Sequence, residues 1–289
     1  MKKIRIIINP ISGSGKQIRA EKAIKKILDK GLFESEIIYS QRKGHITSLA
    51  IEAVEKEYDA VIVVGGDGSL NEAAQGLIGT NTALGIIPIG SGNGLARHLH
   101  IPMSLSGAVN RINQFNTRRI DTAKVNEHSF ISIAGLGFDA KVADQFSQSK
   151  KRGLWNYAKI SIREYFRFTN QKYRLILDSY IVDTDTFMII FANSNQFGNN
   201  FVIAPEAKID DGFLDVCLVK KPKLYEIPGV IINLFEKNIH KSKWLEVRKA
   251  KQIKVELKNI ALMNIDGEAI QDSGAINITI NPLSLSVLI

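Results

Sequence analysis

The chain has 289 residues, of which 45% are hydrophobic, and this length exceeds the size at which a single hydrophobic core usually stops growing, so we expect two domains. An excess of 38 Lys and Arg over 29 Asp and Glu gives a formal net charge of +9, which suits an anionic partner such as a nucleotide, a nucleic acid or an acidic membrane. The single cysteine, Cys217, excludes a disulfide framework and a cysteine-based zinc site, and no run of about 18 apolar residues predicts a membrane span, so we expect a reduced, cytoplasmic protein.

Four strand, loop and helix units are predicted between residue 1 and about residue 120. The apolar strand-like runs are 4–9, 35–40, 60–65 and 83–90. The helical patterns that follow them are 17–32, 47–58, 70–79 and 94–99. This alternation favours a mostly parallel sheet with helices on both faces, in which ligands bind at the carboxyl ends of the strands.

Three glycine-bearing loops should open on that edge of the sheet, at 9–15, 65–68 and 90–94. The first ends in Gly15-Lys16 and invites comparison with the Walker phosphate loop. That loop requires a glycine where Pro10 stands and a hydroxyl residue where Gln17 stands. The first loop is therefore not of the Walker type, and Lys16 is left open between a phosphate contact and a solvated cation in the first helical turn.

The second loop, GGDG at 65–68, carries the strongest chemical signal. Its glycines let backbone amides approach a phosphate, and the start of the following helix adds a positive dipole end. A carboxylate among such amides, Asp67, suits handling of Mg²⁺ or of a transferring phosphoryl group. The alternative is a plain turn with Ser69 and Glu72 as a capping box, which we expect in part.

After Asp121 the pattern changes to strands with few helices. The strands are predicted at 128–138, 173–182, 186–194, 213–219, 252–257, 261–267, 275–280 and 285–289. Helices are predicted at 154–168 and 224–237, the second kinked or shortened by Pro228. We therefore predict an α/β domain at 1–120 and an antiparallel β-sandwich at 121–280, with 281–289 able to return to the first domain and an active cleft between the domains.

Five motifs along the chain occur in the order seen in the diacylglycerol kinase catalytic family. They are Asn9-Pro10 with Ser12-Gly13, GGDGS at 65–69 followed by LNE, IPIGSGN at 87–93 followed by LAR, DDG at 210–212 and DGE at 266–268. The chain resembles that family, which includes bacterial lipid kinases and sphingosine kinases, from Asn9 to Glu268, whereas NAD kinases and phosphofructokinases share only GGDG. The resemblance implies a NAD kinase-like N-terminal domain, a lipid-substrate sandwich, and ATP- and Mg²⁺-dependent transfer of the γ-phosphoryl group to a lipid hydroxyl.

The resemblance also implies the residues of the site. Asp67 and Glu268 would be catalytic, Glu268 as the general base that accepts the hydroxyl proton. The nucleotide would be bound by Asn9, Pro10, Ser12, Gly13, Ser40, Gly65, Gly66, Asp67, Gly68, Ser69, Glu72, Ser91 and Asn93. Asn93 is left open between bridging phosphates and holding its loop, and His45 is interpreted as the start of a helix rather than as a catalyst.

A structural Mg²⁺ is implied in the second domain, held by the Lys208 carbonyl, the Asp211 carboxylate and the Phe213 carbonyl, with Asp210 reaching toward Asp67 through a water molecule. Carbonyl and carboxylate oxygens suit a hard cation. Without the resemblance, the same residues would be interpreted as an ordinary Asp-Gly hairpin turn.

The expected partner is a lipid substrate at an anionic membrane surface, which the protein would approach peripherally, and no nucleic acid. Basic and aromatic residues at 150–168, and a second cationic stretch at 237–251, could lie on such a surface, although packing on the sandwich is the alternative for the first. Diacylglycerol is the expected acceptor, with a sphingoid base or phosphatidylglycerol as alternatives because Ser91 and Gly94 depart from the family's usual Thr and Asp. A NAD kinase and a non-catalytic nucleotide or lipid sensor are less favoured, and a homodimer through edge strands is left open.

Overall fold

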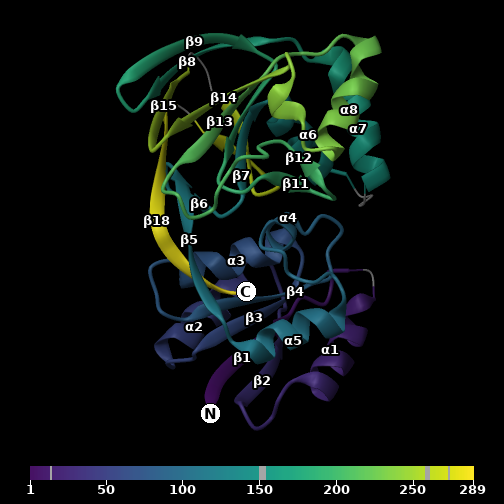
Figure 1. The fold of residues 1–289 in the computed structure, drawn as a ribbon, viewed down its shortest axis with the longest axis vertical. Coiled ribbons are helices and arrows are strands. Elements are labelled where there is room, and N and C mark those ends of the chain that lie inside the picture. The colour runs from purple at the N-terminus through teal and green to yellow at the C-terminus, as the bar shows by residue number, and fades with distance from the viewer. Residues whose placement is uncertain (14, 150–153, 258–260, 273) are drawn as a thin grey trace. The chain divides into compact units, whose positions relative to one another are not determined.

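The computed structural model describes residues 1–13, 15–149, 154–257, 261–272 and 274–289 (Figure 1). The chain divides into two compact units. Unit 1 contains Met1–Thr122 and Pro282–Ile289, and unit 2 contains Ala123–Asn281. Two strands cross the division, β5 (Thr117–Val125) and β18 (Ile276–Leu288). No helix in the described ranges is long and apolar enough to cross a membrane.

Unit 1 is built on a parallel sheet with the strand order β2-β1-β3-β4-β18. Its first four strands are β1 (Lys2–Ile8), β2 (Phe33–Tyr39), β3 (Ala60–Gly65) and β4 (Ala83–Pro88). The helices are α1 (Lys16–Ile27), α2 (His45–Glu55), α3 (Asp67–Leu77), α4 (Gly94–His98) and α5 (Leu105–Gln114). Helix α1 packs with α5, and α2 packs with α3. The right-handed connection expected between parallel strands places these two pairs on opposite faces of the sheet, and β3 and β4 are buried along their whole length.

The predicted fold class of this part is confirmed, with one helix added. Helix α5 was not predicted, although Ser104 marks its start by accepting a hydrogen bond from the Gly107 N–H at 3.3 Å. Helix α5 packs beside α1 and against β4. An N-cap serine was therefore the available signal for it.

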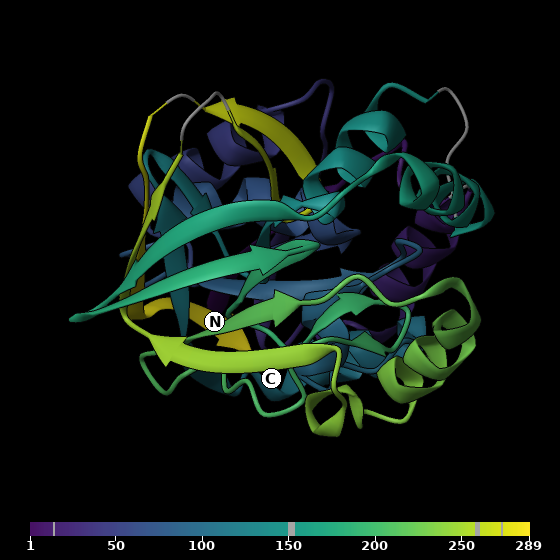
Figure 2. The ribbon, with the colours of Figure 1, turned by 90° about the horizontal axis from the view of Figure 1, so that it is seen from above.

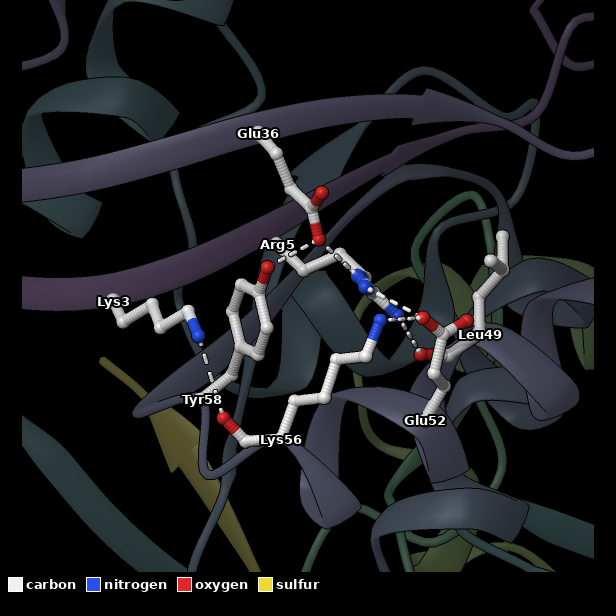
Figure 3. Close-up of polar contacts among 7 residues, drawn as sticks. All are labelled: Lys3, Arg5, Glu36, Leu49, Glu52, Lys56 and Tyr58. Carbon is white, nitrogen blue, oxygen red and sulfur yellow. Dashed lines mark hydrogen bonds and ion pairs between the residues drawn. The ribbon is translucent and has the colours of Figure 1, made fainter.

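A buried arginine ties α2 to the sheet (Figure 3). Arg5 on β1 is 2% exposed, and its Nε donates to Glu36 Oε1 on β2 at 2.5 Å. The other guanidinium nitrogens donate to the Leu49 carbonyl at 2.9 Å and to Glu52 Oε1 at 3.2 Å, both on α2. Burial alone would raise the pKa of Glu36, but hydrogen bonds from Tyr58 and Arg5 outweigh it and lower that pKa. The charged group therefore fixes α2, and with it the loop that precedes α2.

Unit 2 contains, among its described residues, two large antiparallel sheets and the small antiparallel pair β11-β12. The first large sheet has the order β14-β13-β10-β7-β16-β17, and the second joins β18, β15, β8 and β9 and also takes in β5 and β6. The remaining strands of the unit are β6 (His128–Phe130), β7 (Ile133–Gly137), β8 (Gln171–Leu177), β9 (Tyr180–Thr186), β10 (Met188–Ala192), β11 (Gln196–Gly198), β12 (Phe201–Val202), β13 (Leu214–Val219), β14 (Leu245–Ala250), β15 (Gln252–Glu256), β16 (Ala261–Ile265) and β17 (Glu268–Asp272). The helices are α6 (Phe138–Ser147), α7 (Leu154–Arg167) and α8 (Ile227–Phe235), with 3₁₀ turns at Leu224–Glu226 and Ile239–Lys241. Figure 2 shows the curved β8 and β9 ribbons from above.

The two sheets of unit 2 share one hydrophobic core, which confirms the predicted sandwich. Leu136 and Phe191 from the first sheet pack in the same cluster as Leu175 and Val255 from the second. A second cluster covers the outer face of the first sheet, where Cys217 is fully buried as predicted. Helix α8 contributes to this second cluster, so the first sheet of unit 2 is covered on both faces.

Several element boundaries differ from the predictions because side chains set turns inside apolar runs. The stretch 173–182 forms the β8–β9 hairpin instead of one strand, since Asp178 adopts a left-handed φ of 49° and accepts hydrogen bonds from the N–H groups of Lys251 and Gln252. Helix α8 is shorter than the predicted 224–237, as one of the two alternatives for Pro228 had it, and Pro228 lies in its first turn instead of kinking it.

Other differences are additions and mergers. The predicted strand 128–138 is divided into β6 and β7, whereas 275–280 and 285–289 lie in the single long strand β18. Helix α6 and strand β14 were not predicted. Strand β14 was hidden because its residues, LEVRKA, lie in the stretch interpreted only as cationic.

Candidate active site

The three glycine-bearing loops of unit 1 lie side by side at the carboxyl ends of β1, β3 and β4. Asn9 Nδ2 donates to Ser69 Oγ at 2.9 Å, which joins the first loop to α3. The Ile89 N–H donates to the Gly65 carbonyl at 3.0 Å, which joins the third loop to the second. At Gly13, which has φ +73°, an added Cβ would lie 2.7 Å from the Ile89 carbonyl oxygen. The predicted loops are therefore brought together, and glycine is required where the first meets the third.

The second and third loops touch through their backbones. A Cβ at Gly90 would lie 2.6 Å from Gly66 Cα, and a Cβ at Gly66 would lie 3.1 Å from Gly90 Cα. Such a distance leaves no room for a side chain at position 90. Asn93 secures the same turn, because its Nδ2 donates to the Gly90 carbonyl at 2.9 Å while its backbone adopts a left-handed φ of 52°.

Gly68 differs from these glycines because neither packing nor backbone conformation requires it. An added Cβ would meet no atom within 4 Å, and its φ lies outside the left-handed range. Gly68 is the second residue of α3, next to Asp67, and the first N–H groups of a helix have no acceptor inside the helix. The open space beside these amides fits an anionic ligand such as a phosphate.

The capping box predicted for Ser69 and Glu72 is wrong. Helix α3 begins at Asp67 with Gly66 as its N-cap, and no side chain caps it. Ser69 is then the third residue of the helix, and its Oγ accepts the hydrogen bond from Asn9 Nδ2. Glu72 Oε2 accepts a hydrogen bond from the Gly44 N–H at 3.0 Å, so it supports the start of α2 instead of α3.

The other predicted nucleotide-binding residues lie at the same edge of unit 1. Ser40 is buried directly after β2, and its N–H donates to the Ile8 carbonyl at 3.0 Å. Ser12 N–H donates to the Asn9 carbonyl at 3.2 Å, and the Pro10 carbonyl accepts from Gln17 Nε2 at 2.9 Å. Ser91 is exposed.

Two further residues near that edge have structural assignments of their own. Lys16 is exposed at the first position of α1. His45 begins α2, and its Nδ1 accepts from the Gln41 N–H at 3.0 Å, which confirms it as a helix-start residue.

Unit 2 presents Glu268 on a tightly anchored hairpin between β16 and β17. Asp266 and Gly267 form its two-residue turn, with φ values of 47° and 91°. The Asp266 carboxylate accepts hydrogen bonds from three successive backbone N–H groups, those of residues 131, 132 and 133, at 2.8, 2.9 and 2.9 Å. Asp266 is thus the anchor of the turn, whereas Glu268 begins β17 and is exposed.

A buried polar pair supports the same hairpin. Asn264 Oδ1 accepts from the Gly267 N–H at 2.9 Å, and Asn264 Nδ2 donates to Asp139 Oδ2 on α6 at 2.7 Å. Burial raises the pKa of Asp139 to about 6, and the hydrogen bond from Asn264 opposes this. Sequence reasoning missed Asp139, and the available signal was an aspartate directly after GLGF, where β7 turns into α6.

The DDG turn at 210–212 is closed by a lysine. Lys249 Nζ on β14 lies 2.7 Å from Asp211 Oδ2 and 3.3 Å from Asp215 Oδ1. Asp211 Oδ1 accepts from the Phe213 N–H at 3.1 Å. Burial raises the pKa of Asp215, which is 2% exposed, and Lys249 opposes this rise. Lys208 is exposed and Asp210 is half-buried.

Unit 2 also contains a cavity of about 1230 Å³ between its two sheets. Leu136 and Leu262 line it from the first sheet, and Tyr173 lines it from the second. Phe168 and Leu257 add further apolar surface, and the charged lining residues are Lys141, Asp144, Lys172, Arg174, Asp183, Asp185 and Glu256. Its size and its mixed lining suit a molecule with an apolar part and a polar end.

A parallel sheet with three glycine-bearing loops, followed by a sandwich that carries an Asp-Gly-Glu hairpin, is the architecture expected of a two-unit kinase. The model of the diacylglycerol kinase catalytic domain matches residues 3–125, and that of the YegS C-terminal NAD kinase beta sandwich-like domain matches residues 132–289. The chain belongs to the diacylglycerol kinase family, a family of lipid kinases, and this confirms the resemblance seen in its sequence.

Similar proteins extend over nearly the whole chain. A diacylglycerol kinase of Staphylococcus saprophyticus is 30% identical over 273 residues, which cover 92% of this chain and 89% of that protein. A diacylglycerol kinase of Staphylococcus epidermidis is 30% identical over 275 residues, covering 92% and 86%. A crystal structure of a diacylglycerol kinase from Bacillus anthracis has a TM-score of 0.77 at 22% identity and covers 99% of this chain and 96% of that chain, which shows the shared fold.

The raised pKa of Asp139 predicts a pH-dependent stability. The folded chain keeps this proton up to a pH of about 6, whereas the unfolded chain loses it near 3.8, so the free energy of unfolding should fall as the pH rises between these values. The loss should be about 3 kcal/mol and should be absent from Asp139→Asn. Urea unfolding across this pH range measures the difference, and equal pH dependence in both proteins would contradict the assignment.

Proposed function

We propose that the protein transfers the γ-phosphoryl group of ATP, with Mg²⁺, to the hydroxyl group of diacylglycerol. The observation that carries this proposal is the loop edge of unit 1, where open space at Gly68 adjoins the helix start that bears Asp67. Relatives named diacylglycerol kinase, similar over 92% of this chain, support the choice of acceptor.

In this proposal, backbone amides of unit 1 bind the phosphates of ATP. The donors are the first N–H groups of α3, with the Ser12 hydroxyl, Ser40, Ser91 and Asn93 completing the edge, because the N–H groups of Asn9, Ile11 and Ser12 already donate to protein oxygens. Asp67 would hold the Mg²⁺ that accompanies ATP, and that ion would neutralise charge on the phosphates. The exposed Lys16 is not needed for this binding mode, because helix-start amides supply the positive potential.

Glu268 would accept the proton of the lipid hydroxyl. The hydroxyl oxygen of the lipid forms a bond to the γ-phosphorus while the bond between that phosphorus and the ADP oxygen breaks. The Asp266 anchor and the Asn264 contact fix the backbone from which Glu268 extends. An exposed carboxylate at the end of a rigid turn is accessible to a substrate hydroxyl. A non-catalytic sensor would need neither Asp67 nor Glu268, which disfavours that alternative.

The structural Mg²⁺ predicted at the DDG turn fits the observed contacts poorly. A divalent cation on Asp211 would have to share that carboxylate with the Lys249 ammonium and the Phe213 N–H. The structural Mg²⁺ stays a prediction. The pairing of Lys249 with Asp211 does not favour it, because the lysine already supplies a positive charge at the turn.

The cavity between the sheets of unit 2 is our candidate for the apolar part of the lipid. Peripheral binding to an anionic membrane would present such a substrate, and the net charge of +9 favours it. The cations Lys150, Lys151 and Arg152, predicted to contribute, lie outside the described residues. A homodimer through edge strands stays a prediction.

Transfer of radiolabelled phosphate from ATP tests the proposal directly. Diacylglycerol, a sphingoid base and phosphatidylglycerol would be offered side by side in mixed micelles, with NAD in solution as a further acceptor. We expect label in the product of diacylglycerol. Preferential labelling of the sphingoid base or of phosphatidylglycerol would replace the acceptor, and labelling of NAD alone would overturn the lipid assignment.

Two isosteric substitutions separate the proposed roles of the carboxylates. Asp67→Asn should nearly abolish turnover with the fold intact, because it removes the charge that organises Mg²⁺ and ATP. Glu268→Gln should lower kcat by about 10² to 10⁴ with little change in ATP affinity, as expected of a proton acceptor. Glu127→Gln, on a carboxylate 93% exposed, is the control and should behave as the wild type. Near wild-type activity of Asp67→Asn at saturating Mg²⁺ would mean that GGDG is only a turn and has no catalytic role.

Chelation tests the charge at the DDG turn. Without ATP, EDTA should leave the Tm of the wild type unchanged, because Lys249 and not a metal neutralises Asp211 and Asp215. Lys249→Met should lower the Tm by several degrees, since about 1 kcal/mol corresponds to roughly 2–4 °C in a chain of this size. Lys208→Met, an exposed lysine of the same turn, should not. A wild type that loses stability in EDTA would instead support the structural Mg²⁺.

A further inference from the structure

Helix α8 of unit 2 exposes an apolar face that carries no charge. Its sequence, IPGVIINLF, contains no acidic or basic residue. Val230 and Leu234 face inward and pack on the second core cluster. Ile231 and Ile232 lie outside this contact and are 42% and 54% exposed, and Phe235, 49% exposed, packs one side of its ring on Phe201 of β12, with the ring centroids 4.4 Å apart.

The 3₁₀ turn before α8 extends this surface. Leu224 and Tyr225 are 58% and 75% exposed. We call the five side chains Leu224, Tyr225, Ile231, Ile232 and Phe235 the α8 patch. A helix that is apolar on all sides is normally buried, so an exposed one indicates a surface that something else covers.

Helix α8 has few polar side-chain groups that would favour contact of its outer side with water. Asn233 is its only residue with a polar side chain, and Asn233 Nδ2 donates to the Gly229 carbonyl at 2.7 Å within the helix. The Trp244 ring packs beneath α8, and its Nε1 donates to Glu226 at 3.3 Å. The inner side is therefore held by the sandwich while the outer side can enter an apolar medium without leaving its side-chain amide unpaired.

Lysines flank the α8 patch on both sides along the chain. Six lysines and two glutamates lie between residues 220 and 243, namely Lys220, Lys221, Lys223, Lys237, Lys241 and Lys243 with Glu226 and Glu236. Lys243 Nζ is paired with Glu226 at 2.5 Å and Lys221 Nζ donates to the Phe168 carbonyl at 2.6 Å, so Lys220, Lys223, Lys237 and Lys241 are the exposed cations of the segment outside these two contacts. The segment is thus apolar at its centre and cationic at its ends, which matches the acyl and phosphate layers of an anionic bilayer.

We propose that the α8 patch docks the protein on an anionic lipid surface, with the apolar side chains among the acyl chains and the lysines at the headgroups. The proposal rests on the proposed function, in which the substrate lies in a membrane. A second copy of the chain is the less suitable occupant, because a two-fold contact through this patch would bring like-charged lysine segments together.

Vesicle sedimentation of the full chain, without ATP, tests the patch. The vesicles would be phosphatidylcholine alone or phosphatidylcholine with about 30% phosphatidylglycerol. Ile231→Ser with Ile232→Ser should weaken binding to the anionic vesicles by at least about tenfold. The matched control is Ile51→Ser with Ile181→Ser, at side chains 44% and 53% exposed outside the patch, and it should bind like the wild type.

The charged part is tested with Lys237→Gln and Lys241→Gln, against Lys22→Gln and Lys26→Gln as exposed lysines of unit 1. The first pair should weaken binding several-fold at low salt and lose that effect at high salt, because screening weakens exposed charge contacts. The control pair should change binding less. Equal losses in both pairs would mean that overall charge, and not this segment, draws the protein to the vesicle.

Phosphorylation of a short-chain, water-soluble diacylglycerol separates failure of docking from failure of the proposed function. Ile231→Ser with Ile232→Ser should retain the wild-type rate on this substrate while losing vesicle binding. Absence of any phosphorylation by a wild type that binds vesicles would overturn the function and leave the docking surface. Unchanged vesicle binding by this double variant would overturn the docking surface. If analytical ultracentrifugation then showed a dimeric wild type and a monomeric variant, the patch would be assigned to contact with a second copy.

Discussion

The phosphate-binding edge that we assign to unit 1 depends on one backbone contact, between Gly66 and Gly90. A Cβ at position 90 would lie 2.6 Å from Gly66 Cα, so two loops from neighbouring strands can meet only if this position has no side chain. The contact fixes the start of α3, and the Asn9 hydrogen bond to Ser69 adds the first loop to it. Asp67 and the amides beside it are held in place by this packing.

Unit 2 uses the residues of one short triplet for opposite purposes. Asp266 turns inward and accepts three backbone hydrogen bonds, whereas Glu268, two residues later, is exposed at the start of β17. A carboxylate with three N–H donors is an anchor, and an exposed one can take a proton from a substrate. The rigidity of the hairpin and the exposure of the carboxylate that we propose as the base therefore come from the same sequence, DGE.

The sequence was most informative where periodicity and local chemistry decide the structure. Alternating strands and helices predicted the parallel sheet, and the glycine loops were predicted to meet at one edge of it, as they do. Contacts between distant residues could not be predicted in this way. Lys249 reaches Asp211 across 38 positions, and Asn264 reaches Asp139 across 125, so neither pair leaves a local pattern. Glu72 shows the same limit, since its spacing from Ser69 suggested a capping box while its carboxylate supports α2.

Gly68→Ala tests the central claim, that ligand phosphates occupy the open space at the start of α3. Because the added methyl group meets no protein atom and lies in a helix, the substitution should stabilise the fold by about 0.5–1 kcal/mol. It should raise the Kd of a non-hydrolysable ATP analogue with Mg²⁺ at least about tenfold, because the methyl group would occupy the phosphate position. Calorimetric titration together with thermal unfolding measures both. A more stable variant with weakened ATP binding is the result that this account predicts, and unchanged ATP affinity would contradict it.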